Sequence, residues 1–169
     1  NIQMRFIYLL ILISMSAFSQ MSDDPRSWTV VTDQVMGGKS ELEADYNEGT
    51  FQLKGFVTTK NNGGFVRLAH RPESIDKNTK GIKFMAKGNN ETYEIHVTMK
   101  GIKFPPWGYH SQTFDVGSDW KEYYIEFKDF EKNAFMSPSL KPKNIRDISI
   151  AGFGRDFDVD LTIKDIALF

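Results

Sequence analysis

Apolar and polar side chains alternate with a period of two along much of this chain, and this pattern constrains its fold most strongly. A β-strand shows that period when one face turns to a core and the other to water. After residue 20, no window sustains the 3.6-residue apolar period of a helix. The predicted strands cover residues 28–31, 50–57, 65–69, 82–87, 92–99, 109–116, 122–127, 147–153 and 158–164. We therefore expect an all-β sandwich or barrel.

Turn-forming residues separate these stretches, at positions 37–38, 61–64, 88–90, 105–106 and 117–119. After Lys164 the apolar phase slips by one residue, which predicts a bulge or a turn before a last short strand. The sequence contains neither an internal repeat nor a low-complexity linker. We expect one domain over residues 28–169, preceded by a short lead at 20–27.

The first 19 residues have the pattern of a secretory signal peptide. Arg5 precedes an apolar run at 6–13, and the small residues Ala17 and Ser19 follow it. The run is shorter than the ~20 apolar residues of a transmembrane helix. We expect Met4 to be the true start, cleavage after Ser19, and no stable membrane span afterwards. The expected location is extracytoplasmic, either periplasmic or secreted.

The balanced charge of the chain argues against a nucleic-acid partner. The 169 residues carry 21 Lys and Arg against 22 Asp and Glu, a net charge of -1, and contain no cysteine. A nucleic-acid surface needs a basic excess, so we expect no nucleic-acid partner. Without disulfides, an exported domain of this size depends on its packed core for stability.

Motifs for catalysis are absent from the sequence. None of His70, His96 and His110 has a second His or Cys at zinc-ligand spacing, and no Gly-x-Ser-x-Gly elbow occurs. The aspartates at 156, 158 and 160 lack the Gly and Glu of a calcium loop, and strand alternation explains their spacing. We predict no catalytic residue, metal ligand or cofactor, and no enzyme activity; a structural cation held by loop carbonyls stays open.

One loop concentrates aromatic residues. Residues 104–109 place two prolines among three rings, including Trp107 and Tyr109, and prolines restrict the loop's freedom. Such rings stack on sugars or anchor a protein partner, or they cover one end of the core. Glu94, His96 and Thr98 form the polar face of a predicted strand, and we expect His96 to be solvated or to face a groove.

Two glycine motifs carry a family resemblance. Trp28 followed by Asp-Gln-Val-Met-Gly-Gly-Lys-Ser at 33–40, and Asn-Gly-Gly-Phe at 62–65 followed by Arg67, resemble the signatures of the complex I intermediate-associated protein 30 family. The resemblance spans about residues 28–169. Gln34 stands where the family usually has Gly, and residues 131–140 lack its common Gly-Arg.

The resemblance implies a galactose-binding-like jelly-roll β-sandwich. Mitochondrial members of the family help to assemble respiratory complex I and have no known catalysis. We expect the motif residues to be mainly structural: glycines at sharp turns, Asp33 and Asn62 bonding loop amides, and Met36 and Phe65 plugging the loops into the sandwich end. The motif residues are Trp28, Asp33, Met36, Gly37, Gly38, Asn62, Gly63, Gly64 and Phe65. Binding by Ser40 and Arg67 is the alternative.

Two functional hypotheses follow. The first is a non-catalytic exported module of the complex I intermediate-associated type, which binds a protein or assists assembly of a complex. The second is a carbohydrate-binding module that uses Trp107, Tyr109 and the polar strand face of Glu94 and His96. The expected partner is accordingly a protein or a glycan.

Overall fold

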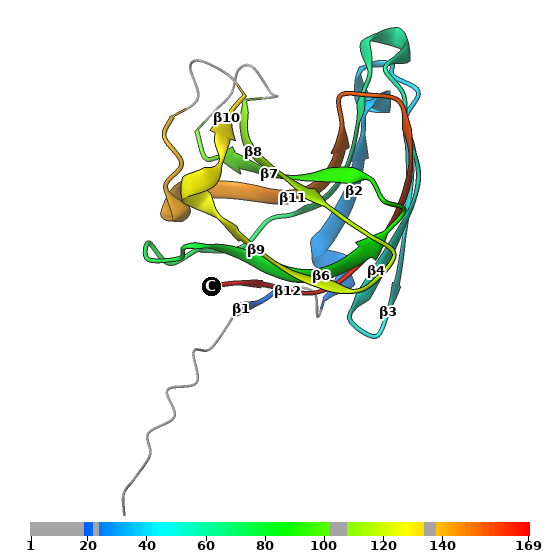
Figure 1. Ribbon diagram of the computed structural model, residues 1–169. Coiled ribbons are helices and arrows are strands. Elements are labelled where there is room, and N and C mark those ends of the chain that lie inside the picture. Colours follow the sequence, from blue (N-terminus) through cyan, green and yellow to red (C-terminus); the bar gives the residue numbers. More distant parts are fainter. Residues whose placement is uncertain (1–18, 22–23, 102–107, 134–137) are drawn as a thin grey trace, which may run out of the picture.

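A computed structural model describes residues 19–21, 24–101, 108–133 and 138–169. Within these residues the chain forms two antiparallel β-sheets that face each other, as Figure 1 shows, with short 3-10 turns and no α-helix. The prediction of an all-β sandwich is therefore confirmed. No helix in these described ranges is long and apolar enough to cross a membrane.

The strands, in chain order, are β1 (Ser19–Gln20), β2 (Trp28–Thr32), β3 (Glu41–Asn47), β4 (Thr50–Val57), β5 (Phe65–His70), β6 (Gly81–Gly88), β7 (Thr92–Met99), β8 (Tyr109–Asp115), β9 (Lys121–Glu126), β10 (Glu131–Lys132), β11 (Ile145–Phe153) and β12 (Phe157–Leu168). The 3-10 turns are η1 (Pro25–Ser27), η2 (Asp33–Met36), η3 (Lys60–Asn62), η4 (Phe127–Asp129) and η5 (Pro142–Asn144).

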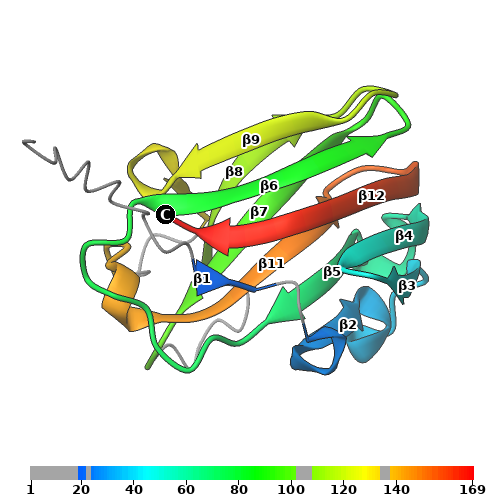
Figure 2. The ribbon, with the colours of Figure 1, turned by 90° about the horizontal axis from the view of Figure 1, so that it is seen from below.

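The two sheets bring distant parts of the chain together. The first has the order β3-β4-β12-β6-β9, with β1 on the far end of β12, and the second has the order β10-β8-β7-β11-β5-β2. Figure 2 shows the strands of the first sheet running across those of the second, with β1 beside the C-terminal end of β12. In the second sheet, β5 and β7 flank β11, so residues near 67, 94 and 151 are neighbours.

The core lies between the sheets and contains the predicted apolar phases. In β7, Tyr93, Ile95, Val97 and Met99 are each at most 1% exposed, and Phe84 stacks on Tyr123 with ring centroids 5.2 Å apart. Burial of this aromatic and aliphatic area is the main stabilising term for a chain without disulfides. The alternation thus identifies the core face of the central strands correctly.

The edges of the sheets differ from expectation. Strand β3 is absent from the predicted strands, because its alternating side chains Leu42, Ala44 and Tyr46 are only partly buried at the sheet edge and show little apolar contrast. The two-residue strands β1 and β10 were not predicted either. The phase slip after Lys164 is confirmed as a bulge: Asp165 has φ 53°, and β12 continues to Leu168.

The described part of the predicted lead is bonded to the sandwich through Met21. The Met21 amide donates to the Ile166 carbonyl at 2.7 Å, and Met21 is 6% exposed. The buried Trp28 ring donates its Nε1–H to the Met21 carbonyl at 2.9 Å. Trp28 is therefore a core residue whose hydrogen bond holds Met21 beside β12. This position is consistent with the structural role predicted for Trp28.

Candidate functional site

Asp33 joins the two glycine motifs. Its side chain is fully buried and accepts bonds from the Ser40 amide at 2.9 Å, the Ser40 hydroxyl at 2.5 Å and the Gly64 amide at 2.6 Å. The Phe65 amide lies 3.3 Å from the same carboxylate. One carboxylate thus satisfies donors from the loop after β2 and from the loop before β5, which holds the two loops together.

The glycines of both motifs are required by this arrangement. Gly37 has φ 87° and Gly64 has φ 132°, a region that side chains disfavour. A Cβ atom on Gly38 or on Gly63 would overlap the Asp33 carboxylate. The predicted turn role of the motif glycines agrees with this geometry, and close approach to Asp33 is a second reason for them.

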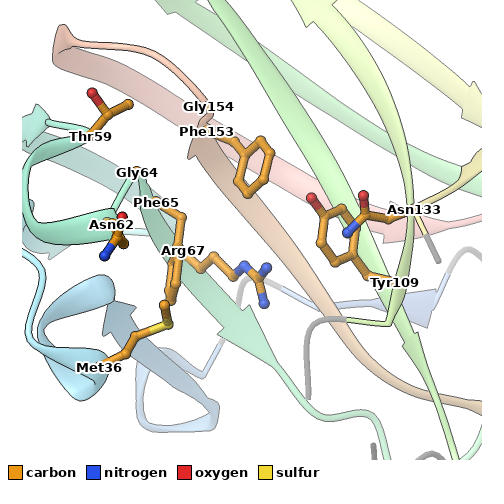
Figure 3. Close-up of a pocket in the computed structure, with 11 residues that line it drawn as sticks. Met36, Thr59, Asn62, Gly64, Phe65, Arg67, Tyr109, Asn133, Phe153 and Gly154 are labelled. Atoms are coloured by element: carbon orange, nitrogen blue, oxygen red, sulfur yellow. The ribbon is translucent and has the colours of Figure 1, made fainter. Parts of the chain in front are cut away.

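A pocket of about 270 Å³ opens where these loops meet the second sheet. It lies on the sheet face that points away from the core, because its strand residues alternate with buried ones such as Val66 and Leu68. Figure 3 shows Arg67 extending toward Tyr109, with Phe153 on the same side of the pocket. The lining residues are Met36, Thr59, Asn62, Gly63, Gly64, Phe65, Arg67, Tyr109, Asn133, Phe153 and Gly154.

Stacked rings form the floor of this pocket. The Tyr109 ring lies parallel to His96, with centroids 4.1 Å apart and planes 13° apart. Phe153 meets both rings edge-on, at 5.3 Å from His96 and 5.7 Å from Tyr109. The three rings come from β7, β8 and β11, so the sheet itself fixes their positions. A floor built on strands is rigid enough to recognise a shape.

Burial shifts the pKa values of His96 and Tyr109 in the pocket floor. It lowers the pKa of His96, although the hydrogen bond to Glu94 opposes this, so the imidazole is neutral at pH 7. His96 Nε2 lies 2.5 Å from a Glu94 carboxylate oxygen, which places the ring proton on that nitrogen. Burial also raises the pKa of Tyr109 to about 12, so its hydroxyl stays protonated.

Arg67 supplies the positive charge of the pocket. Its guanidinium carbon lies 4.8 Å from the Phe65 ring centroid and 5.1 Å from that of Tyr109. Burial lowers the pKa of Arg67, but an arginine remains charged under all ordinary conditions. The cation therefore rests between two rings, where cation–π attraction holds it in place.

The structure divides the predicted site residues into three groups. It brings Arg67, Tyr109, Glu94 and His96 together on one sheet face. His96 is fully buried beneath Tyr109, so of its two expected positions, solvated or facing a groove, the solvated one is wrong. It buries Ser40, whose hydroxyl bonds Asp33 and lies 3.2 Å from the Thr58 carbonyl oxygen, so Ser40 has structural contacts and does not line the pocket. Trp107 lies outside the described residues.

Two expectations for the motif side chains need correction. Met36 is 45% exposed and Phe65 is partly exposed, so both line the pocket and do not plug the sandwich end. Asn62 is exposed at the rim, and the loop-to-loop bond comes from Asn61, whose amide lies 3.3 Å from the Gly37 carbonyl oxygen. Both differences arise because the loops lie beside the second sheet and leave these side chains in the space above it.

Phe153 and Asn133 are lining residues that the sequence analysis did not identify. Phe153 ends β11 on the face opposite to Ile148 and Ile150, and that phase was a usable signal. Asn133 follows β10, and its amide donates to the Tyr109 carbonyl at 2.8 Å. No local sequence pattern marks Asn133, because its hydrogen bond to Tyr109 joins residues 24 positions apart. The described residues contain no group of three or more side chains suited to hold a metal ion.

The fold and the pocket define a class: an antiparallel two-sheet β-sandwich with a recess of about 270 Å³ on one sheet. Within this class, the sequence matches the model of one family, complex I intermediate-associated protein 30, over residues 16–163. The chain belongs to that family. No curated protein shows significant sequence similarity to it.

Solved structures that share this fold include carbohydrate-binding modules and a part of an agarase. A family 11 carbohydrate-binding module from Clostridium thermocellum, in complex with a β-1,3-1,4-mixed-linked tetrasaccharide, has a TM-score of 0.69 and 16% identity, and covers 85% of this chain and 88% of its own. The family 11 module of a cellulosomal cellulase of that organism has a TM-score of 0.69 and 18% identity over 91% and 96%. An agarase matches with a TM-score of 0.59 and 11% identity, over 88% of this chain and 23% of its own. At these identities the likeness shows the fold alone.

Proposed function

We propose that this chain is a non-catalytic carbohydrate-binding module whose ligand occupies the pocket beside Arg67. The observation that carries this proposal is the pocket lining: the Arg67 guanidinium lies against the rings of Phe65 and Tyr109, and Phe153 meets Tyr109 edge-on in the same lining. Sugar rings offer C–H faces that stack on aromatic side chains and hydroxyls that bond polar groups. The carbohydrate-binding modules of the same fold support the proposal but do not identify the ligand.

Phe65→Ala is expected to weaken glycan binding by roughly tenfold or more, because it removes one stacking ring and one support of Arg67. The measurement is a glycan array followed by isothermal titration with any glycan that binds. Phe56→Ala is the matched control, since Phe56 is also partly exposed on a strand but lines no part of this pocket. Equal affinity of both variants would place the ligand elsewhere. Trp107→Ala separately tests the sequence-based expectation for that ring.

A protein partner is the second candidate, and it rests on the exposed apolar side chains of η2. Val35 is 76% exposed and lies outside the pocket lining, whereas Met36 is 45% exposed and also lines the pocket. Exposed apolar side chains of this kind anchor protein partners. Crosslinking in the native host should capture a partner that the double variant Val35→Ser, Met36→Ser loses. Capture that is the same with the double variant would argue against this surface.

We also propose that the chain acts outside the cytoplasm after cleavage following Ser19. Gln20 would then become the first residue, and the buried Met21 would still bond the Ile166 carbonyl in the sheet. Amino-terminal sequencing of material from the periplasm or medium should read Gln-Met-Ser. Recovery of cytoplasmic protein that still begins at Met4 would contradict export.

A further inference from the structure

Arg67 is the one charged side chain among the described residues that line the pocket. Its Nε is buried and has no hydrogen-bond partner in the described part of the chain. A guanidinium donor kept from water without an acceptor is costly, because the group loses hydration that nothing replaces. A cation in this state favours a ligand that brings the missing acceptor.

The neighbouring carboxylate does not fill that role. Glu94 lies one strand beyond β11, and its oxygen bonds His96 Nε2 at 2.5 Å. Between Arg67 and Glu94 in the sheet register stands Ala151, whose methyl group offers no acceptor. Glu94 attracts Arg67 through space but is absent from the pocket lining.

We propose that the pocket selects saccharides that carry an anionic substituent, a carboxylate or a sulfate, and that Arg67 binds this group. This inference rests on the proposed carbohydrate function and narrows its ligand class. The planar guanidinium fork matches the two oxygens of a carboxylate or sulfate, and charge-assisted bonds are stronger than neutral ones. Phe65 and Tyr109 offer ring contacts to the guanidinium but no acceptor for its N–H groups, so those donors stay available to an anionic group.

The test compares sugars that share ring and linkage and differ in whether they carry an anionic substituent. Oligogalacturonate and its methyl ester share one ring and linkage, and a sulfated galactan oligosaccharide and its desulfated form make a second pair. Isothermal titration of the wild-type chain should show roughly tenfold or greater preference for the anionic member of at least one pair. The pair that shows the preference distinguishes a carboxylate from a sulfate ligand.

Variants of Arg67 connect the preference to this side chain. Arg67→Gln should abolish the preference for the anionic member, and Arg67→Lys should keep part of it, because a lysine retains charge without the planar fork. Arg26→Gln is the control, since Arg26 is an exposed arginine that does not line the pocket. Thermal unfolding verifies that each variant is folded. If Arg67→Gln is unfolded, two measurements still test the proposal. They are the affinity of the wild type for the anionic and the neutral member of each pair, and the same comparison with Arg67→Lys.

The failures of the two proposals are separable. Equal affinity for charged and neutral members, unchanged in Arg67→Lys and Arg67→Gln, would overturn the anionic ligand class while carbohydrate binding stands. A preference for the anionic member that persists in Arg67→Gln would also overturn the role of Arg67. Absence of binding to every saccharide on the array and in both pairs would overturn both proposals.

Discussion

Asp33→Ala is expected to lower the free energy of unfolding by about 4 kcal/mol, which is large for one substitution. The change leaves three backbone amides, those of Ser40, Gly64 and Phe65, without the acceptor that they have in the native fold. Each buried donor without a partner costs roughly 1–3 kcal/mol. The two loops also lose their common anchor, so ligand binding should disappear with the loss of stability.

Urea unfolding of the wild type, Asp33→Ala and Asp45→Ala measures this effect. Asp45 is an exposed aspartate on β3, so its replacement should change the free energy of unfolding by no more than about 0.5 kcal/mol. A loss at Asp33 as small as that at Asp45 would show that water replaces the carboxylate at little cost and would refute its anchoring role.

Acid should reproduce part of the Asp33 effect. Burial alone would raise the pKa of Asp33, but the hydrogen bonds from Ser40, Gly64 and Phe65 outweigh it and hold that pKa below its ordinary value. The stabilisation is therefore complete above the unfolded pKa of about 3.9 and is lost as the pH falls through the lower folded value. The side chain of Asp33→Asn cannot titrate. Between pH 5 and pH 2, the free energy of unfolding of this variant should therefore fall less than that of the wild type, by about 1 kcal/mol for each unit by which folding lowers the Asp33 pKa.

The strands could be predicted because their signal is local. Alternation within β7 distinguishes Ile95 and Val97 from Glu94 and His96, and it places the two sets on opposite faces as observed. The same alternation cannot show what covers the second face. The polar neighbours of His96 predicted a position in solvent or facing a groove, whereas Tyr109, 13 positions further along the chain, covers the ring by stacking.

The site is harder to predict, because its contacts join loops distant in sequence. Asp33 meets Gly64 across 31 positions, and only the folded sheets bring them together. The motif pattern nevertheless contained most of the site, since Met36, Phe65 and Arg67 all line the pocket. Phe153 and Asn133 carried no motif.

Structure and binding are not alternatives for the glycine motifs. Gly63 and Gly64 form part of the pocket wall, and the Asp33 carboxylate holds that wall by bonding the Gly64 amide. The absence of a Cβ atom on Gly63 permits the close approach of the Asp33 carboxylate. The family motif therefore builds the recess in which a ligand would sit.

Tyr109→Ala is the second change for which we expect a large effect. The Tyr109 ring is 2% exposed, stacks on His96 at 4.1 Å and faces the Arg67 guanidinium at 5.1 Å. Removing a buried ring costs about 3 kcal/mol or more. His96 would also meet water, and Arg67 would lose one of its two supports. We expect reduced stability together with loss of glycan binding, measured by urea unfolding and isothermal titration.

Tyr109→Phe separates the ring from the hydroxyl. The phenylalanine ring keeps the stack on His96 and the cation–π contact with Arg67, so stability should stay within about 0.5 kcal/mol of the wild type. Binding should persist if stacking is the dominant contact. Loss of binding in Tyr109→Phe at unchanged stability would instead assign recognition to the hydroxyl, which stays protonated because burial raises its pKa to about 12. Retained binding in Tyr109→Ala, measured below its unfolding temperature, would move the ligand away from this floor.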